Sequence, residues 1–103
     1  MTILDDQQCS HCGRWKNRGV TVDALLIWRG QILLMERAEE PYQGYLALPG
    51  GWLETDHPST AFTAALELLQ ETGVKGINPT LVGVFDNPER HPEQAISIAI
   101  SSP

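Results

Sequence analysis

The stretch from Leu48 to Val74, LPGGWLETDHPSTAFTAALELLQETGV, joins two consecutive glycines to a run with the composition of a helix. Pro58 and Ser59 provide a helix start and Gly73 provides a stop, so we predict a helix over residues 59–72. Gly50 and Gly51 permit a tight turn and a close approach of the backbone to a ligand. The stretch therefore predicts a glycine turn that lies one short loop before a helix.

The predicted helix has an apolar face and a polar face. At about 100° per residue, the apolar arc holds Phe62, Ala65, Leu66 and Leu69, and we expect it to pack on a sheet. The opposite arc holds Thr60, Thr63, Glu67, Gln70 and Glu71.

Glu67 and Glu71 are four residues apart, so their carboxylates are neighbours on the helix surface. Two like charges held there are mutually destabilising unless a cation lies between them. Carboxylates suit Mg²⁺ or Mn²⁺, which commonly bind through few protein carboxylates together with substrate phosphates. The alternative is a solvent-facing side of a helix, on which this spacing is also common.

The rest of the chain predicts a mixed α/β fold. Residues 20–28 and 31–37 flank a short connection with Gly30 and predict an antiparallel hairpin. Residues 45–49 predict a short strand that Pro49 and the glycines end. Residues 77–86 and 95–100 predict two further strands, separated by a polar loop over 87–94.

Composition excludes several classes of protein. Hydrophobic residues make up 42% and charged residues 19% of the 103 residues, the balance of one globular domain. No apolar run approaches the roughly 18 residues of a membrane-spanning helix. The first residues lack the features of a secretory signal, so we expect a cytoplasmic protein. The net charge of −6 argues against non-specific nucleic-acid binding.

Cys9 and Cys12 form a Cys-Ser-His-Cys sequence that has the shape of half a zinc ribbon. Structural zinc takes four ligands, and the chain has no second pair of cysteines. A histidine or a second chain would have to complete a zinc site. The alternative, two reduced thiols at the terminus, is the interpretation we adopt for the segment 1–18.

The stretch resembles the Nudix box, the glycine-loop-helix motif of hydrolases that cleave nucleoside diphosphates linked to another moiety. The box reads G-x5-E-x7-R-E-U-x-E-E-x-G-U, with U an aliphatic residue. The flanking sequences VTVDALLIWRGQILLMER, YLALPGGW and VGVFDNPERHP are similar to those around the box in ADP-ribose pyrophosphatase-like members. The resemblance runs from about Arg18 to Ile100, and it implies a Nudix-like mixed sheet over a domain of residues 19–103.

The box is degenerate in this chain. Glu67 and Glu71 match two of its acidic positions and Gly51 matches its glycine, but Gln70 replaces a Glu and Leu66 occupies the arginine position. The early Glu falls on His57 or Pro58, depending on the direction of counting, because the loop is one residue longer. Losing Arg and an acidic neighbour together leaves no buried unpaired charge. We therefore expect the fold to survive, with lower metal affinity and a lower rate.

The resemblance implies an Mg²⁺- or Mn²⁺-dependent hydrolase of nucleoside diphosphate derivatives such as ADP-ribose. Glu67 and Glu71 are the expected catalytic residues, and they would hold the metal with Gly51 and the uncharged Gln70. Gly50, Gly51 and Trp52 are the expected substrate-binding residues. Tyr42 and Phe85 are further aromatic candidates, and Glu54, Glu89 and Glu93 are further loop carboxylates. The alternative is a catalytically silent module that binds a nucleotide or a partner protein.

The chain ends directly after a predicted strand, at Ser102 and Pro103. A sheet that ends there needs a cover for its far face, and the C-terminal segment usual in the family is absent. A missing terminal piece, a partner chain and a minimal domain each account for this. We expect a homodimer, because the uncovered strand is open to pairing.

Overall fold

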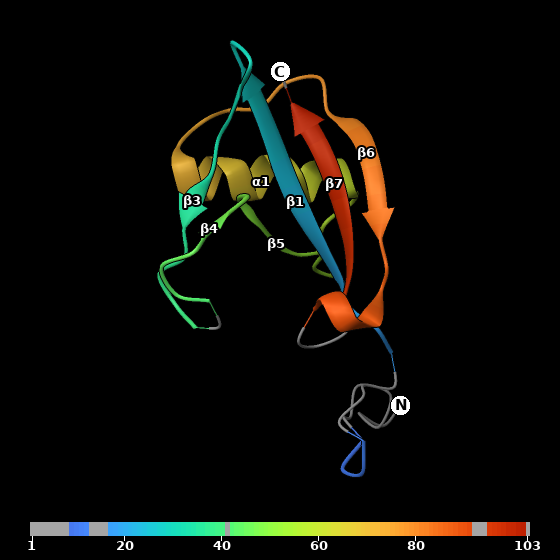
Figure 1. Cartoon of the computed structure of the whole chain (residues 1–103). Helices are drawn as coiled ribbons and strands as arrows, with labels where there is room; N and C mark the ends of the chain where they lie inside the picture. Colours follow the sequence, from blue (N-terminus) through green and yellow to red (C-terminus); the bar gives the residue numbers. More distant parts are fainter. Residues whose placement is uncertain (1–8, 13–16, 41, 92–94, 103) are drawn as a thin grey trace.

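The computed structural model describes residues 9–12, 17–40, 42–91 and 95–102. It contains a five-stranded mixed sheet with the helix α1 (Thr60–Thr72) packed on one face (Figure 1). This arrangement confirms the α/β fold class predicted above.

The sheet has the strand order β2-β1-β7-β6, and β5 also pairs with β1. The strands are β1 (Val20–Trp28), β2 (Gln31–Ile32), β5 (Gly50–Trp52), β6 (Thr80–Phe85) and β7 (Ile96–Ser102). The two longest, β1 and β7, pair in parallel at the centre, and the other pairs are antiparallel. A separate two-stranded ribbon joins β3 (Met35–Glu36) to β4 (Leu46–Ala47).

The core lies between the sheet and α1. Its buried side chains are Val22, Ala24, Ala64, Leu68 and Ile100, with Leu26, Leu33, Leu53 and Ile98 packed around them. Side chains alternate between the faces of a strand, so Val22 and Ala24 point to the helix while Thr21 and Asp23 point to the opposite face. This alternation gives the sheet one apolar face and one polar face.

The helix begins and ends as predicted. Ser59 is the N-cap, and its side chain accepts a hydrogen bond of 3.0 Å from the N–H of Phe62. Gly73 is the C-cap, with a left-handed φ of 76° that a residue without a Cβ adopts at no steric cost. Its N–H donates to the carbonyl of Leu69.

The predicted face of the helix was wrong. Phe62 and Leu69 are 43% and 49% exposed, and the buried residues are instead Thr63, Ala64 and Leu68. Thr63 tolerates burial because its hydroxyl group donates to the carbonyl of Ser59. The helix is therefore rotated so that Glu67 faces the edge of the sheet rather than bulk solvent.

Two strand predictions also need correction. The run 31–37 is not one strand, because β2 pairs with β1 while β3 pairs with β4. Gly50 and Gly51 do not form a turn, because they belong to β5 and pair with Asp23 and Val22 of β1. The loop after β6 contains a 3-10 helix, η2 (Pro88–Arg90), capped by Asn87.

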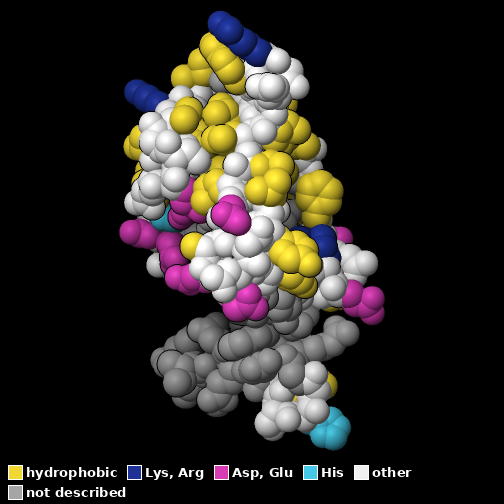
Figure 2. Space-filling view, turned by 60° about the vertical axis from the view of Figure 1, so that its left-hand side comes forward, with side chains coloured by type: hydrophobic (Ala, Val, Ile, Leu, Met, Phe, Trp, Pro, Cys, Tyr) yellow, Lys and Arg dark blue, Asp and Glu magenta, His cyan; other side chains and the backbone are white. Residues whose placement is uncertain are grey.

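Large hydrophobic side chains remain exposed on the β1–β2 hairpin and the loop between β3 and β4. In Figure 2, which brings this side forward, hydrophobic side chains gather over the upper half of the described part and carboxylates over the lower half. The hairpin and this loop contribute Ile27, Trp28, Ile32, Tyr42 and Tyr45 to the exposed set, and Leu34 before β3 and Leu46 in β4 are exposed beside them. Among the described residues, no helix is long and apolar enough to cross a membrane.

Candidate functional site

The two glycines of β5 place the helix carboxylates against the strand backbone. A Cβ on Gly51 would lie 2.7 Å from the Cδ and Oε1 atoms of Glu67, so only glycine leaves room for this carboxylate. The N–H of Gly50 donates a hydrogen bond of 3.0 Å to Oε2 of Glu71. The structure therefore brings together four of the predicted site residues, from two separate elements.

The same arrangement raises the pKa of the Glu71 carboxyl group. Partial burial is the main cause, followed by the charge of Glu67 and a hydrogen bond between the two carboxyl groups, while the Gly50 N–H opposes the rise. Holding both groups ionised costs free energy. A divalent cation between them would remove that cost.

The donor set fits Mg²⁺ or Mn²⁺ as a site of two carboxylates. These ions are commonly held by one or two carboxylates together with phosphate oxygens and water. Gln70 is exposed, and its side chain forms no hydrogen bond with any described residue. Within the described ranges, no group of three or more His, Cys, Asp or Glu side chains is placed to hold one ion.

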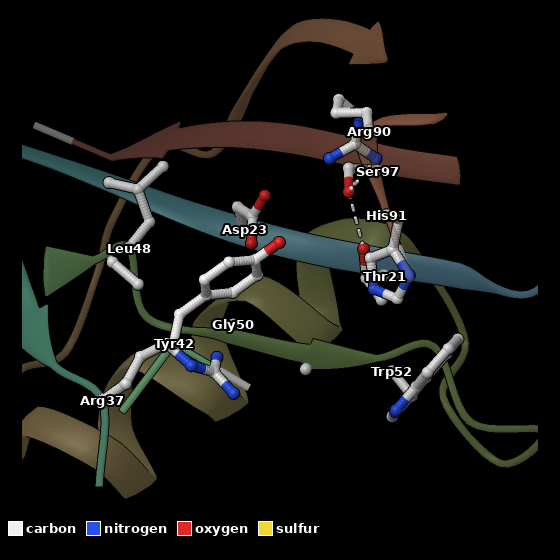
Figure 3. A pocket seen from close by; sticks show the side chains of 12 residues that line it. Thr21, Asp23, Arg37, Tyr42, Leu48, Gly50, Trp52, Arg90, His91 and Ser97 are labelled. Atoms are coloured by element: carbon white, nitrogen blue, oxygen red, sulfur yellow. Dashed lines mark hydrogen bonds between the residues drawn. The ribbon is translucent and has the colours of Figure 1, made fainter. Parts of the chain in front are cut away.

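A cavity of about 600 Å³ opens on the polar face of the sheet, on the other side of β5 (Figure 3). It lies over β1, β5 and β7, with the β3–β4 ribbon and its loop on one side and η2 on the other. Its lining residues are Thr21, Asp23, Arg37, Tyr42, Ala47, Leu48, Gly50, Gly51, Trp52, Arg90, His91 and Ser97. The predicted substrate-binding residues Gly50, Gly51 and Trp52 all line it.

A second cavity of about 260 Å³ reaches Glu71. Gly50 and Arg37 line both cavities. The backbone of β5 at Gly50 therefore lies between Glu71 on one side and Asp23 on the other.

Arg90 fixes one end of the large cavity. Its Nη2 group donates to the carbonyls of Phe85 (3.3 Å) and Ala95 (3.2 Å) and to Oγ of Ser97 (2.8 Å). The Ser97 hydroxyl is in turn 2.8 Å from the Thr21 hydroxyl, which joins β7 to β1 across the cavity floor (Figure 3). These contacts tie η2 to the centre of the sheet.

Asp23 lies in the middle of this floor. Burial raises the pKa of its carboxyl group, and the charges of Arg90 and His91 act in the opposite direction. A Cβ on Gly50 would lie 2.7 Å from its Oδ1 atom. Both glycines of β5 thus leave room for a carboxylate, on opposite faces of the strand.

Aromatic side chains stand at both ends of the cavity. The Trp52 and His91 rings meet edge to face with centroids 5.9 Å apart, and Tyr42 packs against Tyr45 with the same separation. Trp52 is 40% exposed and so offers ring surface to a ligand. Phe85, the third aromatic candidate, does not line the cavity.

The other residues singled out from sequence lie elsewhere. His57 has a structural role, because its Nδ1 atom accepts from the N–H of Glu54 and lies 2.9 Å from the Thr63 hydroxyl. Glu54 and Glu89 are exposed loop residues outside both cavities, and Glu93 lies outside the described residues. Cys9 and Cys12 are exposed and form no disulfide within the described part, while most of segment 1–18 lies outside it.

Sequence reasoning missed the floor of the cavity. The sequence pattern places Asp23 in a mostly apolar strand and gives no indication of a site at Thr21, Ser97 or Arg90. One signal was available: Asp23 is the single charged residue in the run Val20–Trp28. A charge within a central strand is costly to bury and is often functional.

A family model described as the NUDIX domain matches residues 17–100. An ADP-ribose pyrophosphatase from Methanocaldococcus jannaschii is 34% identical over 73 residues, which cover 71% of this chain and 43% of that protein. The chain therefore spans less than half the length of this relative.

Solved structures with the same fold include proteins bound to nucleotides. A MutT/nudix family protein from Enterococcus faecalis superposes with a TM-score of 0.78 at 26% identity, over 86% of this chain and 38% of that chain. The NUDIX domain of Shewanella oneidensis NrtR, complexed with ADP ribose, gives 0.76 at 26% identity, over 85% and 61%. A bifunctional NMN adenylyltransferase/ADP ribose pyrophosphatase from Francisella tularensis, complexed with AMP and Mn ion, gives 0.67 at 30% identity, over 84% and 27%.

Proposed function

Because this chain belongs to the NUDIX domain family, we propose that it hydrolyses nucleoside diphosphate derivatives of the ADP-ribose type in a reaction that depends on Mg²⁺ or Mn²⁺. One observation carries the proposal: Glu67 and Glu71 lie against Gly50 and Gly51, two residues of β5 that also line the cavity of about 600 Å³. That volume lies in the range of small-molecule sites. The ADP-ribose pyrophosphatase relative and the neighbours complexed with ADP ribose and AMP support this substrate class.

The chain's own residues would divide the work as follows. Glu67 and Glu71 would hold the cation, and the glycine backbone at Gly50 and Gly51 would let a diphosphate approach it closely. When bound, the cation supplies charge neutralisation at the phosphoryl oxygens and lowers the pKa of water. Trp52 offers a ring face to the base or sugar at one end of the cavity.

A second candidate function is a catalytically silent domain that binds a nucleotide. Three positions favour it: Leu66 and Gln70 stand where the family motif has an arginine and an acid, and the early acid of the motif falls on His57 or Pro58. Of these, His57 is committed to hydrogen bonds with the loop and with Thr63. The NUDIX domain of NrtR complexed with ADP ribose is an example of this fold with such a ligand bound.

The deciding experiment measures release of AMP from ADP-ribose, NADH and dinucleoside polyphosphates, with and without Mg²⁺. The hydrolase proposal expects Mg²⁺-dependent AMP from at least one compound. No product across the panel, together with a melting temperature that still rises with ligand, would favour the silent domain. Neither product nor a shift in melting temperature would reject both functions.

We also retain the homodimer as a proposal. The reason given from the sequence was wrong, because the last strand β7 is paired on both sides, by β1 and by β6. The edge strand is instead β6, which exposes hydrophobic side chains, among them Leu81, Val84 and Phe85. Light scattering at several concentrations tests it, and a constant monomer mass would reject it. The cytoplasmic location also stays a prediction.

A further inference from the structure

Asp23 is a charged group in the cavity that the proposed hydrolysis does not use. It projects from β1 onto the polar face of the sheet, and its side chain is half-buried (Figure 3). Among the described residues, no hydrogen bond or ion pair reaches its carboxylate, although Arg90 and His91 influence it through their charge. An ionised carboxylate has about four acceptor positions, and partly buried polar groups are normally paired. The carboxylate therefore has acceptor positions available to a ligand.

The neighbouring polar groups are already committed to one another. The Nη2 group of Arg90 donates to Ser97 and to two backbone carbonyls, and the Ser97 hydroxyl pairs with Thr21. The floor of the cavity thus presents the carboxylate of Asp23, and the guanidinium group of Arg90 nearby is held by hydrogen bonds within the protein. The Asp23 carboxylate accepts hydrogen bonds from uncharged donors and repels an anion in direct contact with it, although Arg37, Arg90 and His91 also line the cavity.

The position of Asp23 relative to the carboxylate pair sets which part of a ligand it meets. Asp23 lies beside Gly50, and Glu67 lies beside the adjacent Gly51, on the opposite face of β5. The two cavities share Arg37, Ala47, Leu48 and Gly50, and the charge of Asp23 acts on Glu71. A ligand whose diphosphate binds a cation at Glu67 and Glu71 would therefore have its next chemical group near Asp23. This inference rests on the proposed function. If that function holds, Asp23 contacts the group that follows the diphosphate and helps to select it.

We propose that Asp23 is a specificity residue that accepts hydrogen bonds from the hydroxyl groups of the sugar linked to the nucleoside diphosphate and excludes a phosphate from the same position. The preferred ligands are then sugar-linked nucleoside diphosphates, and nucleoside triphosphates are disfavoured. A hydrogen bond to a charged group contributes about a tenfold or larger effect on affinity.

The test compares ADP-ribose with ATP, because ATP carries a phosphate where ADP-ribose carries a sugar. Calorimetry in EDTA gives the Kd of each compound without cleavage, and kcat/KM with Mg²⁺ gives the same comparison for the reaction. In the wild type, ADP-ribose binds more tightly. Asp23→Asn is expected to weaken ADP-ribose about tenfold and to tighten ATP, so that the ratio of the two Kd values falls. The control Asp56→Asn makes the same charge change at an exposed loop residue outside both cavities and leaves the ratio unchanged.

Three results would overturn the inference. An unchanged ratio in Asp23→Asn, or an equal loss for both compounds, would leave Asp23 with a structural role. A weaker Mn²⁺ affinity in Asp23→Asn, measured by titration without nucleotide, would place Asp23 with the metal instead. Absence of binding of both compounds by the wild type would also reject it. In contrast, binding with the expected ratio but no AMP release would reject the hydrolase proposal and support the role of Asp23.

Discussion

Both sides of β5 present carboxylates, but the two sides are assembled in different ways. On the helix side, Glu67 and Glu71 come from one turn of α1 and are set next to each other by their spacing of four residues. On the cavity side, Asp23 and its neighbours come from β1, β7 and η2, and only the pairing of the sheet brings them together. A thin glycine backbone separates the two sides.

Because of this difference, the two sides suit two different tasks in binding one ligand: charge neutralisation and discrimination between ligands. The helix side has paired acids whose repulsion a cation relieves, so it is suited to charge neutralisation. The cavity side has one acid and three basic side chains, Arg37, Arg90 and His91, together with hydroxyl groups and aromatic rings, so it is suited to discrimination between ligands. We expect substitutions on the two sides to act on different measured quantities.

The largest effect is expected from breaking the helix side. Glu67→Gln and Glu71→Gln each remove a carboxylate from the proposed metal site, and kcat/KM with Mg²⁺ should fall about a hundredfold or more. The rise in melting temperature with Mg²⁺ should also disappear, while the Kd of ADP-ribose in EDTA should not weaken. Glu54→Gln, at an exposed loop residue, is the matched control. An unchanged Mg²⁺ response in Glu71→Gln would remove the metal site from the proposal.

A smaller loss is expected when the glycine next to Glu67 gains a methyl group. In Gly51→Ala the new Cβ would lie 2.7 Å from the Glu67 carboxylate, so this flexible side chain must move away. We expect Mn²⁺ affinity, measured by titration, to fall about tenfold with little change in melting temperature. Gly83→Ala is the control, because its Cβ would meet the Phe85 ring at an ordinary 3.5 Å. Equal Mn²⁺ affinity in both variants would contradict the close packing at Gly51.

Restoring the family motif on α1 should raise the rate of the proposed reaction. The double substitution Leu66→Arg and Gln70→Glu supplies an acid beside Glu71 and a cation that offsets the added charge. The rate of AMP release with Mg²⁺ should rise about tenfold, and the ratio of the Kd values for ADP-ribose and ATP should not change. Gln70→Glu alone separates the two contributions. A flat response in both variants would mean that the longer loop at His57 already limits the site.

The smallest effect concerns pH and the metal-free protein. Because the pKa of Glu71 is raised in the folded state, the folded protein holds this proton more tightly than the unfolded chain. The stabilisation is present below the ordinary value of 4.5 and is lost as the pH rises through the raised value. Urea denaturation should show this decline in the wild type and a smaller decline in Glu71→Gln. An identical pH dependence in both proteins would contradict the raised pKa.

Local sequence patterns predicted the helix side well. The helix ends follow from Ser59 and Gly73, and the spacing of the two glutamates follows from helical geometry. The orientation of the helix could not be predicted by counting apolar residues. Thr63 is polar but can be buried, because its hydroxyl group donates a hydrogen bond to the carbonyl of Ser59. The glycines were predicted as a turn because their composition favours one, whereas pairing with β1 extends them into a strand.

The cavity side could not be predicted in the same way. Thr21 and Ser97 are 76 residues apart, and their contact depends on the register of a parallel pair. A shift of one residue in that register would send Asp23 and Ser97 to different faces. No pattern within a short window of sequence encodes such a register. Asp23 was therefore visible only as an unexplained charge in an apolar strand.

The parallel pairing of β1 and β7 also has a consequence for biosynthesis. The central pair of the sheet joins Val20–Leu26 to Ile96–Ser102, so it forms only after the whole segment up to β7 has left the ribosome. Until then, β1 exposes an unsatisfied edge and the apolar face that α1 later covers. Long-range pairing of this kind also slows folding. Nascent chains of this protein should therefore depend on chaperones more than those of a helical bundle of equal length.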